Sequence, residues 1–145
     1  MFKSQYVPDF IEDYKIHLKL KPKFKNLVKD ISNIIIYGPN GSGKYTLSKC
    51  LLNSFYKKKI KLIRNEYTHK ISTKILKYYS SSYHFEIELT RYDNIKLVNK
   101  LLLEISNNNE INNDCKFKLI IIKNPELGNN DTFRIIKYNL ERKHI

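Results

Sequence analysis

Cysteines and long apolar runs are both scarce in this sequence, and each scarcity excludes a class of protein. The two cysteines, Cys50 and Cys115, form no metal-binding pair and no framework of disulfide bridges, as expected in a reducing compartment. No apolar run reaches the roughly 20 residues that a membrane-spanning helix needs. The N-terminus carries acids early and lacks an apolar segment, which argues against a secretory signal. The sequence therefore predicts a soluble, intracellular protein that is not secreted and has no membrane partner.

The length and the overall composition are those of one globular domain. The chain has 145 residues, of which 41% are hydrophobic and 28% charged, with 11 tyrosines and 7 phenylalanines. A chain of this length buries about 70% of the surface that it exposes when unfolded. A second full-sized domain is therefore excluded, as is a disordered chain.

The net charge of +13 suits an anionic partner, because lysines that neutralise phosphates release counterions. A DNA or RNA partner is one interpretation of this charge. Solvated surface lysines are the other, and composition does not decide between them.

Strands and helices are predicted to alternate along the chain. Helices are expected at residues 22–31, 44–58, 93–105 and 131–143, strands at 33–37, 60–64, 83–89 and 117–122, and a polar loop at 107–114. This alternation predicts an α/β fold in which a mainly parallel sheet is flanked by helices on both faces, a three-layer architecture.

A glycine-rich loop is expected to join the strand at 33–37 to the helix at 44–58. Its glycines let successive N–H groups turn inward towards a polyphosphate, and the helix N-terminus adds its positive end. The G-x-x-x-x-G-K spacing in this context predicts a phosphate-binding loop (P-loop) for a nucleotide such as ATP. The predicted nucleotide-binding residues are Gly38, Pro39, Asn40, Gly41, Ser42, Gly43, Lys44, Tyr45 and Thr46.

The position after the loop lysine departs from the usual pattern. A Ser or Thr hydroxyl normally coordinates magnesium there, whereas this chain has Tyr45, whose phenol is too long for that role. Thr46 is the candidate metal ligand in its place. Nucleotide binding is therefore better supported than magnesium-dependent turnover.

The acidic pair that completes such a site is also missing. After the apolar strand at 117–122, Lys123 and Asn124 occupy the positions expected for the metal-binding and water-orienting acids. The Lys123 charge disfavours a metal ion there. Glu126 follows two residues late and is the candidate catalytic acid, with a plain surface acid as the alternative.

Several stretches resemble the AAA+ clamp-loader family, specifically a small-subunit type of replication factor C. The apolar run at 34–37 leads into Gly38-Pro39, and Tyr45 lies as an extra residue between the loop lysine and Thr46. The stretch at 81–86 is similar to a Ser-x-Tyr-His-apolar-Glu sequence of this type. The strand at 117–122 and the helix that follows also resemble their counterparts.

The resemblance implies an AAA+ fold and an ATP-binding subunit that acts in DNA replication, in the nucleus or wherever replication takes place. Its implied partners are other clamp-loader subunits, a sliding clamp and, through the assembly, DNA. Residues 1–145 would be a single nucleotide-binding domain that ends before the sensor, lid and collar regions. This small-subunit type is itself a poor ATPase, so the missing acids imply weak or absent hydrolysis and leave enzymatic activity open.

Two other functions remain open on the sequence alone. A small P-loop nucleoside or nucleotide kinase suits the length, but it needs an acidic base and arginines over the phosphates, and this chain has four arginines. A basic nucleic-acid-binding module that retains the loop as a structural relic is the third interpretation.

Overall fold

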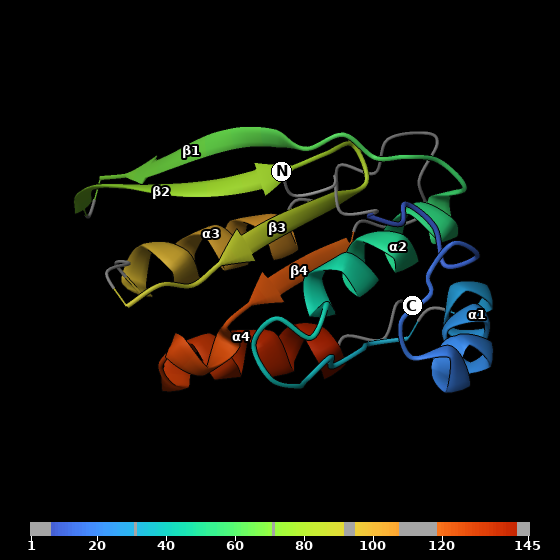
Figure 1. Cartoon of the computed structure of the whole chain (residues 1–145). Helices are drawn as coiled ribbons and strands as arrows, with labels where there is room; N and C mark the ends of the chain where they lie inside the picture. The colour runs from blue at the N-terminus through green and yellow to red at the C-terminus, as the bar shows by residue number, and fades with distance from the viewer. Residues whose placement is uncertain (1–6, 31, 71, 92–94, 108–118, 142–145) are drawn as a thin grey trace, which may run out of the picture. The chain divides into compact units, whose positions relative to one another are not determined.

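The computed structural model divides the chain into two compact units, residues 1–60 and 61–145 (Figure 1). It describes residues 7–30, 32–70, 72–91, 95–107 and 119–141. Each unit has its own apolar core. The prediction of a single nucleotide-binding domain over 1–145 stays a prediction.

The first unit is helical in the part that the structure describes. A short 3₁₀ turn, η1 (Leu18–Leu20), leads into helix α1 (Lys21–Lys29), and α2 (Lys44–Tyr56) follows the glycine-rich loop. Both predicted helices are confirmed. Helix α2 ends before the predicted residue 58 because Lys57 adopts a left-handed conformation with φ of 53°.

The core of the first unit lies between α1, α2 and the segment that precedes them. Its buried members are Ile11, Tyr14, Phe24, Leu47 and Cys50. The preceding segment is held along α2 by hydrogen bonds. The Ile11 amide donates to Ser54 Oγ at 2.9 Å, and Asn53 Nδ2 donates to the Asp9 carbonyl at 2.8 Å. These hydrogen bonds hold the last turn of α2, at the end of the helix opposite the loop.

The predicted buried strand at residues 33–37 is wrong. These residues form no strand, and Ile35 and Tyr37 are 84% and 91% exposed. A β-branched apolar run favours an extended backbone, but it becomes a strand only beside another strand. In the described part of the chain, all strands lie between residues 63 and 123.

The second unit contains a four-stranded sheet in the order β1-β2-β3-β4. Its strands are β1 (Ile63–His69), β2 (Ser72–Ser80), β3 (His84–Glu88) and β4 (Leu119–Lys123). β1 pairs with β2 and β2 with β3 antiparallel, whereas β3 and β4 are parallel. The α/β class is confirmed, but the described sheet is mixed and not mainly parallel.

The mixed topology follows from the lengths of the connections. Residues 70–71 join β1 to β2, and residues 81–83 join β2 to β3. Connections this short allow only antiparallel neighbours, because a parallel pair needs a crossover of about a dozen residues or more. The only described crossover of that length runs from β3 through α3 to β4.

Three strand predictions match the sheet and one strand was missed. The predicted strand at 60–64 overlaps the start of β1, and 83–89 contains β3. The strand at 117–122 matches β4, although residues 117–118 lie outside the described residues. β2 was not predicted, since its exposed Lys74, Ile75 and Lys77 break the apolar alternation.

Helices α3 (Ile95–Asn107) and α4 (Asn130–Glu141) lie on one face of this sheet (Figure 1). The inner face of α3 buries Leu97, Val98, Leu101 and Leu102 in one core with Leu76 of β2, Ile87 of β3 and Leu89, which follows β3. Both helices were predicted. Residues 93–94 and 142–143 of the predicted helices and residues 108–114 of the polar loop lie outside the described residues.

None of the helices in the described segments is long and apolar enough to cross a membrane.

Candidate functional site

The glycine-rich loop enters α2 through backbone conformations that favour glycine. Gly41 has φ of 76°, and Gly43, the N-cap of α2, has φ of 82°. Both lie in the left-handed region, where a side chain is strained. The Gly43 Cα faces the core, since a Cβ there would lie 3.6 Å from the Tyr14 hydroxyl oxygen, whereas a Cβ on Gly41 would meet open space.

The Lys44 side chain folds back over the loop. Its ammonium donates to the carbonyl oxygens of Gly38 and Pro39 at 2.7 and 2.8 Å. An ammonium has three N–H donors, so one remains for a ligand. The loop therefore places a fixed positive charge at the point where its backbone turns.

The backbone donors of the loop are largely available. The Ser42 amide donates to the Pro39 carbonyl at 3.3 Å, but within the described segments the amides of Asn40, Gly41 and Gly43 donate to no protein acceptor. They precede the N-terminus of a 13-residue helix, whose dipole favours an anion. These donors and the Lys44 ammonium fit the phosphates of a nucleotide.

The residues after the lysine fit a magnesium ion poorly. Tyr45 is 39% exposed, and its ring lies 5.6 Å from the Lys49 ammonium, so the phenol is directed along the helix surface. Thr46 is half-buried on the first turn of α2. Among the residues that the structure describes, no group of three His, Cys, Asp or Glu side chains is arranged to hold a metal.

In the second unit, the cation at the end of β4 is neutralised by acids of β3. The Lys123 ammonium lies 2.7 Å from Glu86 Oε1 and 3.5 Å from Glu88 Oε2. The Glu86 side chain is 1% exposed, and that of Lys123 is 23% exposed. The carboxylates thus compensate the positive charge that the sequence places at this strand end.

His84 and Glu86 are not among the residues that the sequence predicted for the site. They alternate with the apolar residues of the strand, a position typical of exposed side chains, yet both are buried. His84 Nε2 lies 3.7 Å from Glu86 Oε2. The missed signal was the charge complementarity between Lys123 and the acids of the neighbouring strand.

The Ser-x-Tyr-His stretch forms the turn into β3. Ser81 Oγ accepts hydrogen bonds from the Tyr83 and His84 amides at 3.0 and 3.1 Å, and it lies 2.6 Å from His84 Nδ1. The serine therefore fixes both the turn and the histidine ring.

The remaining predicted site residues lie just beyond β4. Asn124 has a left-handed backbone, with φ of 52°, and its side chain donates to the Leu89 carbonyl at 3.3 Å. Glu126 is exposed in the 3₁₀ turn η2 (Pro125–Leu127). Its catalytic role stays a prediction.

The buried thiol of the first unit, Cys50, stays in its unreactive protonated form. Burial, with smaller contributions from Asp9 and Asp13, raises the pKa of Cys50 to about 11. Cys50 Sγ donates to the Pro8 carbonyl at 3.2 Å. These features confirm an ordinary buried cysteine at this position, while Cys115 lies outside the described residues.

Comparison with known proteins identifies one class of relative. No protein-family model matches the chain. Over nearly its whole length, however, the chain is similar at low identity to subunits of replication factor C.

Three relatives illustrate this similarity. The chain is 29% identical over 150 residues to a putative replication factor C small subunit of Acanthamoeba polyphaga mimivirus. It is 23% identical over 151 residues to the probable replication factor C subunit 3 of Dictyostelium discoideum, and 22% identical over 149 residues to human replication factor C subunit 3. The alignments cover 96–97% of this chain but 40–43% of the relatives, so the chain spans about two-fifths of their length.

Proposed function

We propose that this chain is a clamp-loader-like ATP-binding protein of DNA replication, with weak or absent hydrolysis. The observation that carries the proposal is the loop at the start of α2. There the Lys44 ammonium and the amides of Asn40, Gly41 and Gly43 form a set of donors suited to phosphates. The similarity to replication factor C subunits supports ATP as the nucleotide and a clamp loader as the setting.

In this proposal, residues 38–46 hold the nucleotide. The backbone amides of the loop bind the β- and γ-phosphates, and the third N–H of Lys44 binds the same oxygens. Thr46 stays the candidate metal ligand, and the proposal does not depend on a bound magnesium ion. Lys123 and Asn124 occupy the positions where a hydrolytic site has acids, and Tyr45 occupies the position of the usual magnesium ligand. These replacements favour ATP binding without efficient hydrolysis.

The proposed partners follow from the relatives and not from contacts in the structure. They are other clamp-loader subunits, a sliding clamp and, through the assembly, DNA. The proposed location is intracellular, in the nucleus or at another site of DNA replication. Capture of the native protein from its source followed by mass spectrometry tests this part. Recovery of loader subunits or a clamp supports it, and reproducible capture of unrelated partners alone contradicts it.

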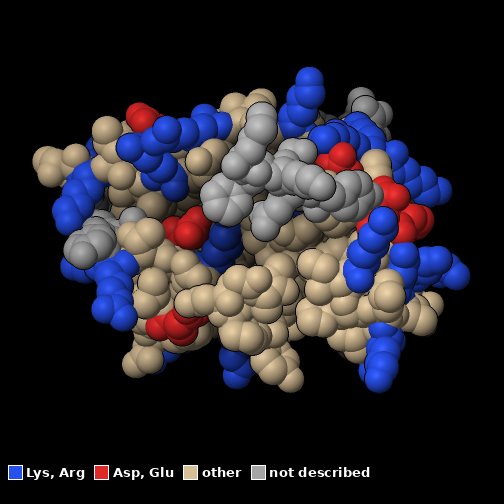
Figure 2. All heavy atoms as spheres, in the orientation of Figure 1, with Lys and Arg blue, Asp and Glu red and all other residues tan. Residues whose placement is uncertain are grey.

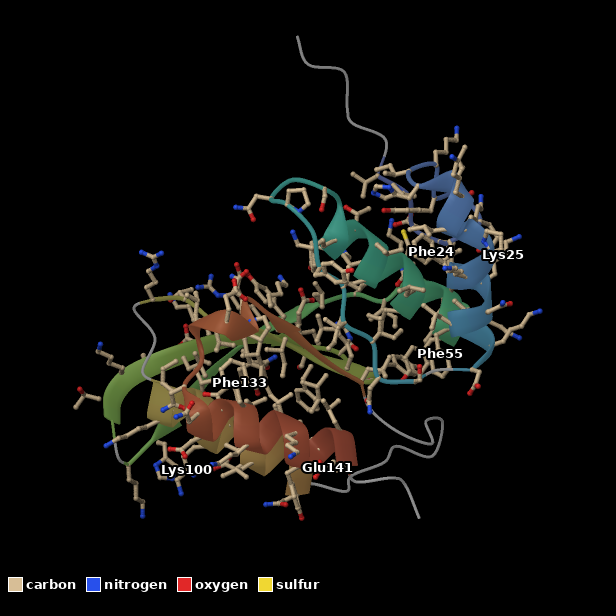
Figure 3. The ribbon with its side chains drawn as sticks, turned by 90° about the horizontal axis from the view of Figure 1, so that it is seen from below. Phe24, Lys25, Phe55, Lys100, Phe133 and Glu141 are labelled. Atoms are coloured by element: carbon tan, nitrogen blue, oxygen red, sulfur yellow. The ribbon has the colours of Figure 1, made fainter. Side chains whose placement is uncertain are left out.

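ATP binding is tested by titrating the protein with a fluorescent ATP analogue. We expect saturable binding that unlabelled ATP competes away and that Lys44→Ala reduces at least about 10-fold, because a charge-assisted phosphate contact contributes about 1.5–3 kcal/mol. Lys100→Ala, an exposed lysine of α3, is the matched control and should bind like the parent (Figure 3). Equal affinities of the parent and Lys44→Ala would refute the loop as the site.

A product assay separates the proposed function from the kinase alternative. With ATP and a set of nucleosides and nucleotides, we expect little ADP and no phosphorylated product. Transfer of phosphate to any acceptor would favour the kinase.

A further inference from the structure

Lysines are concentrated on η1 and α1 in the first unit. Residues 15–29 contain six lysines and no acid, and the nearest acids in sequence, Asp13 and Asp30, lie at the two ends of the segment. We call the exposed lysines of η1 and α1, Lys19, Lys23, Lys25 and Lys29, the α1 basic surface. In the described segments, none of these four takes part in an ion pair.

The packing of α1 fixes which way these lysines point. Phe24 is buried, and Leu27 and Val28 are half-buried against the same core. Figure 3 shows Phe24 on the side of α1 that faces α2 and Lys25 on the opposite side. The lysines are therefore held on the solvent side of an anchored helix.

The spacing of the lysines concentrates positive charge. Lys25 and Lys29 are four residues apart, so they are neighbours on one flank of the helix, about 6 Å apart along its axis. Like charges at this spacing repel each other and destabilise a helix slightly. Because no carboxylate of the segment relieves the repulsion, a bound polyanion would do so.

We propose that the α1 basic surface binds the sugar–phosphate backbone of a nucleic acid directly, at a place separate from the nucleotide loop. The charge complementarity favours this occupant, since regularly spaced phosphates match several lysines at once. Phe24, the only Phe, Tyr or Trp in the segment, is buried, so no exposed ring of these three types offers a stacking platform for bases. Binding is therefore directed at phosphates and independent of base sequence.

A high net charge by itself also attracts nucleic acids, so the test of a local site needs a matched control. Figure 2 shows Lys and Arg side chains over much of the visible face, with a few Asp and Glu among them. A diffuse effect of the +13 net charge would respond equally to the loss of any four lysines. Binding at a local site weakens only when the lysines of that site are removed.

The test compares two variants of the full chain with equal net charge. The first changes Lys19, Lys23, Lys25 and Lys29 to Gln, and the control changes Lys57, Lys61, Lys70 and Lys100 to Gln. All eight side chains are exposed, so both variants are expected to fold. Circular dichroism and retained binding of the fluorescent ATP analogue confirm that the first variant is folded.

Binding to labelled 20-base-pair DNA and RNA duplexes is measured by fluorescence anisotropy from 0.05 to 0.2 M NaCl. For four phosphate contacts, the slope of log K against log salt is expected to be about −3.6 for the parent and close to zero for the first variant. The affinity at 0.15 M should fall by roughly 10²–10³-fold in that variant, following the same slope. The control should resemble the parent, and both duplexes should bind.

Several outcomes would overturn the proposal. Equal loss in the two variants would show a diffuse charge effect, and binding of one type of duplex only would rule out backbone contacts alone. Absence of duplex binding by the parent would also refute it. The exposed Ile16, Leu18 and Leu20 suggest one further arm with anionic lipid vesicles. Vesicle binding without duplex binding would assign the surface to a membrane instead.

Discussion

Removing the buried carboxylate of Glu86 should destabilise the protein measurably. In Glu86→Gln, the Lys123 ammonium loses the negative charge of the carboxylate 2.7 Å away and keeps that of Glu88 at 3.5 Å. Breaking a fully buried ion pair costs about 3–5 kcal/mol, and breaking an exposed one about 0–1 kcal/mol. With Lys123 at 23% side-chain exposure, we expect the free energy of unfolding to fall by about 2 kcal/mol, between these limits.

Urea denaturation followed by circular dichroism at pH 7 measures this change. A loss of about 2 kcal/mol corresponds to a fall in Tm of about 4–8 °C for a chain of this size. Glu88→Gln is the matched control, because its side chain is 54% exposed and should cost less than about 1 kcal/mol. If Glu86→Gln is no more destabilising than Glu88→Gln, the buried ion pair does not stabilise the strand ends.

Three further predictions concern backbone strain, packing and thiol chemistry. Gly43→Ala should cost about 1–2 kcal/mol in thermal or urea unfolding, because alanine is strained at φ of 82°; an unchanged Tm would contradict the conformation of the loop. Gly128→Ala should also lower the Tm, since its Cβ would lie 2.8 Å from Thr132 Cγ2 and 2.9 Å from Thr132 Cβ, and an unchanged Tm would contradict this close packing. In a Cys115→Ser background, iodoacetamide should alkylate native Cys50 at least about 100-fold more slowly than the urea-unfolded chain at pH 8, because a pKa of about 11, two units above the ordinary value, leaves about 100-fold less thiolate; similar rates would show that the thiol is accessible.

Much of the helical structure could be predicted because its signals are local. The apolar face of α3, with Leu97, Leu101 and Leu102, repeats at helical spacing, and the glycine-rich loop marks the start of α2. Helix ends were less accurate, since the left-handed residue Lys57 that ends α2 carries no glycine signal.

The sheet was harder to predict because its signals are not local. The apolar run at 33–37 has the composition of a strand, but a strand depends on a partner that the segment itself does not contain. Conversely, β2 pairs with β1 through a short connection in spite of exposed lysines such as Lys74 and Lys77. In both cases the presence or absence of a partner strand decided whether a strand formed. The periodicity of the segment itself does not reveal its partner.

The residues of the candidate site show the same difference between local and non-local signals. The loop at 38–44 is a contiguous motif, so the sequence could predict its residues, and their role in nucleotide binding stays a prediction. The contact of Lys123 with Glu86 joins residues far apart in the sequence. Glu86 is buried although it lies among the polar residues of an alternating strand, which are usually exposed. A charge that appears unpaired in the sequence can thus be compensated by the neighbouring strand.

The central claim is that backbone amides of the loop bind the phosphates of ATP, and amide NMR shifts on titration with ATP test it most directly. We expect the largest shifts at Asn40, Gly41 and Gly43, whose amides donate to no acceptor within the described residues, with smaller shifts along the first turn of α2. Saturating ATP that shifts amides elsewhere and leaves these three unchanged would contradict the account.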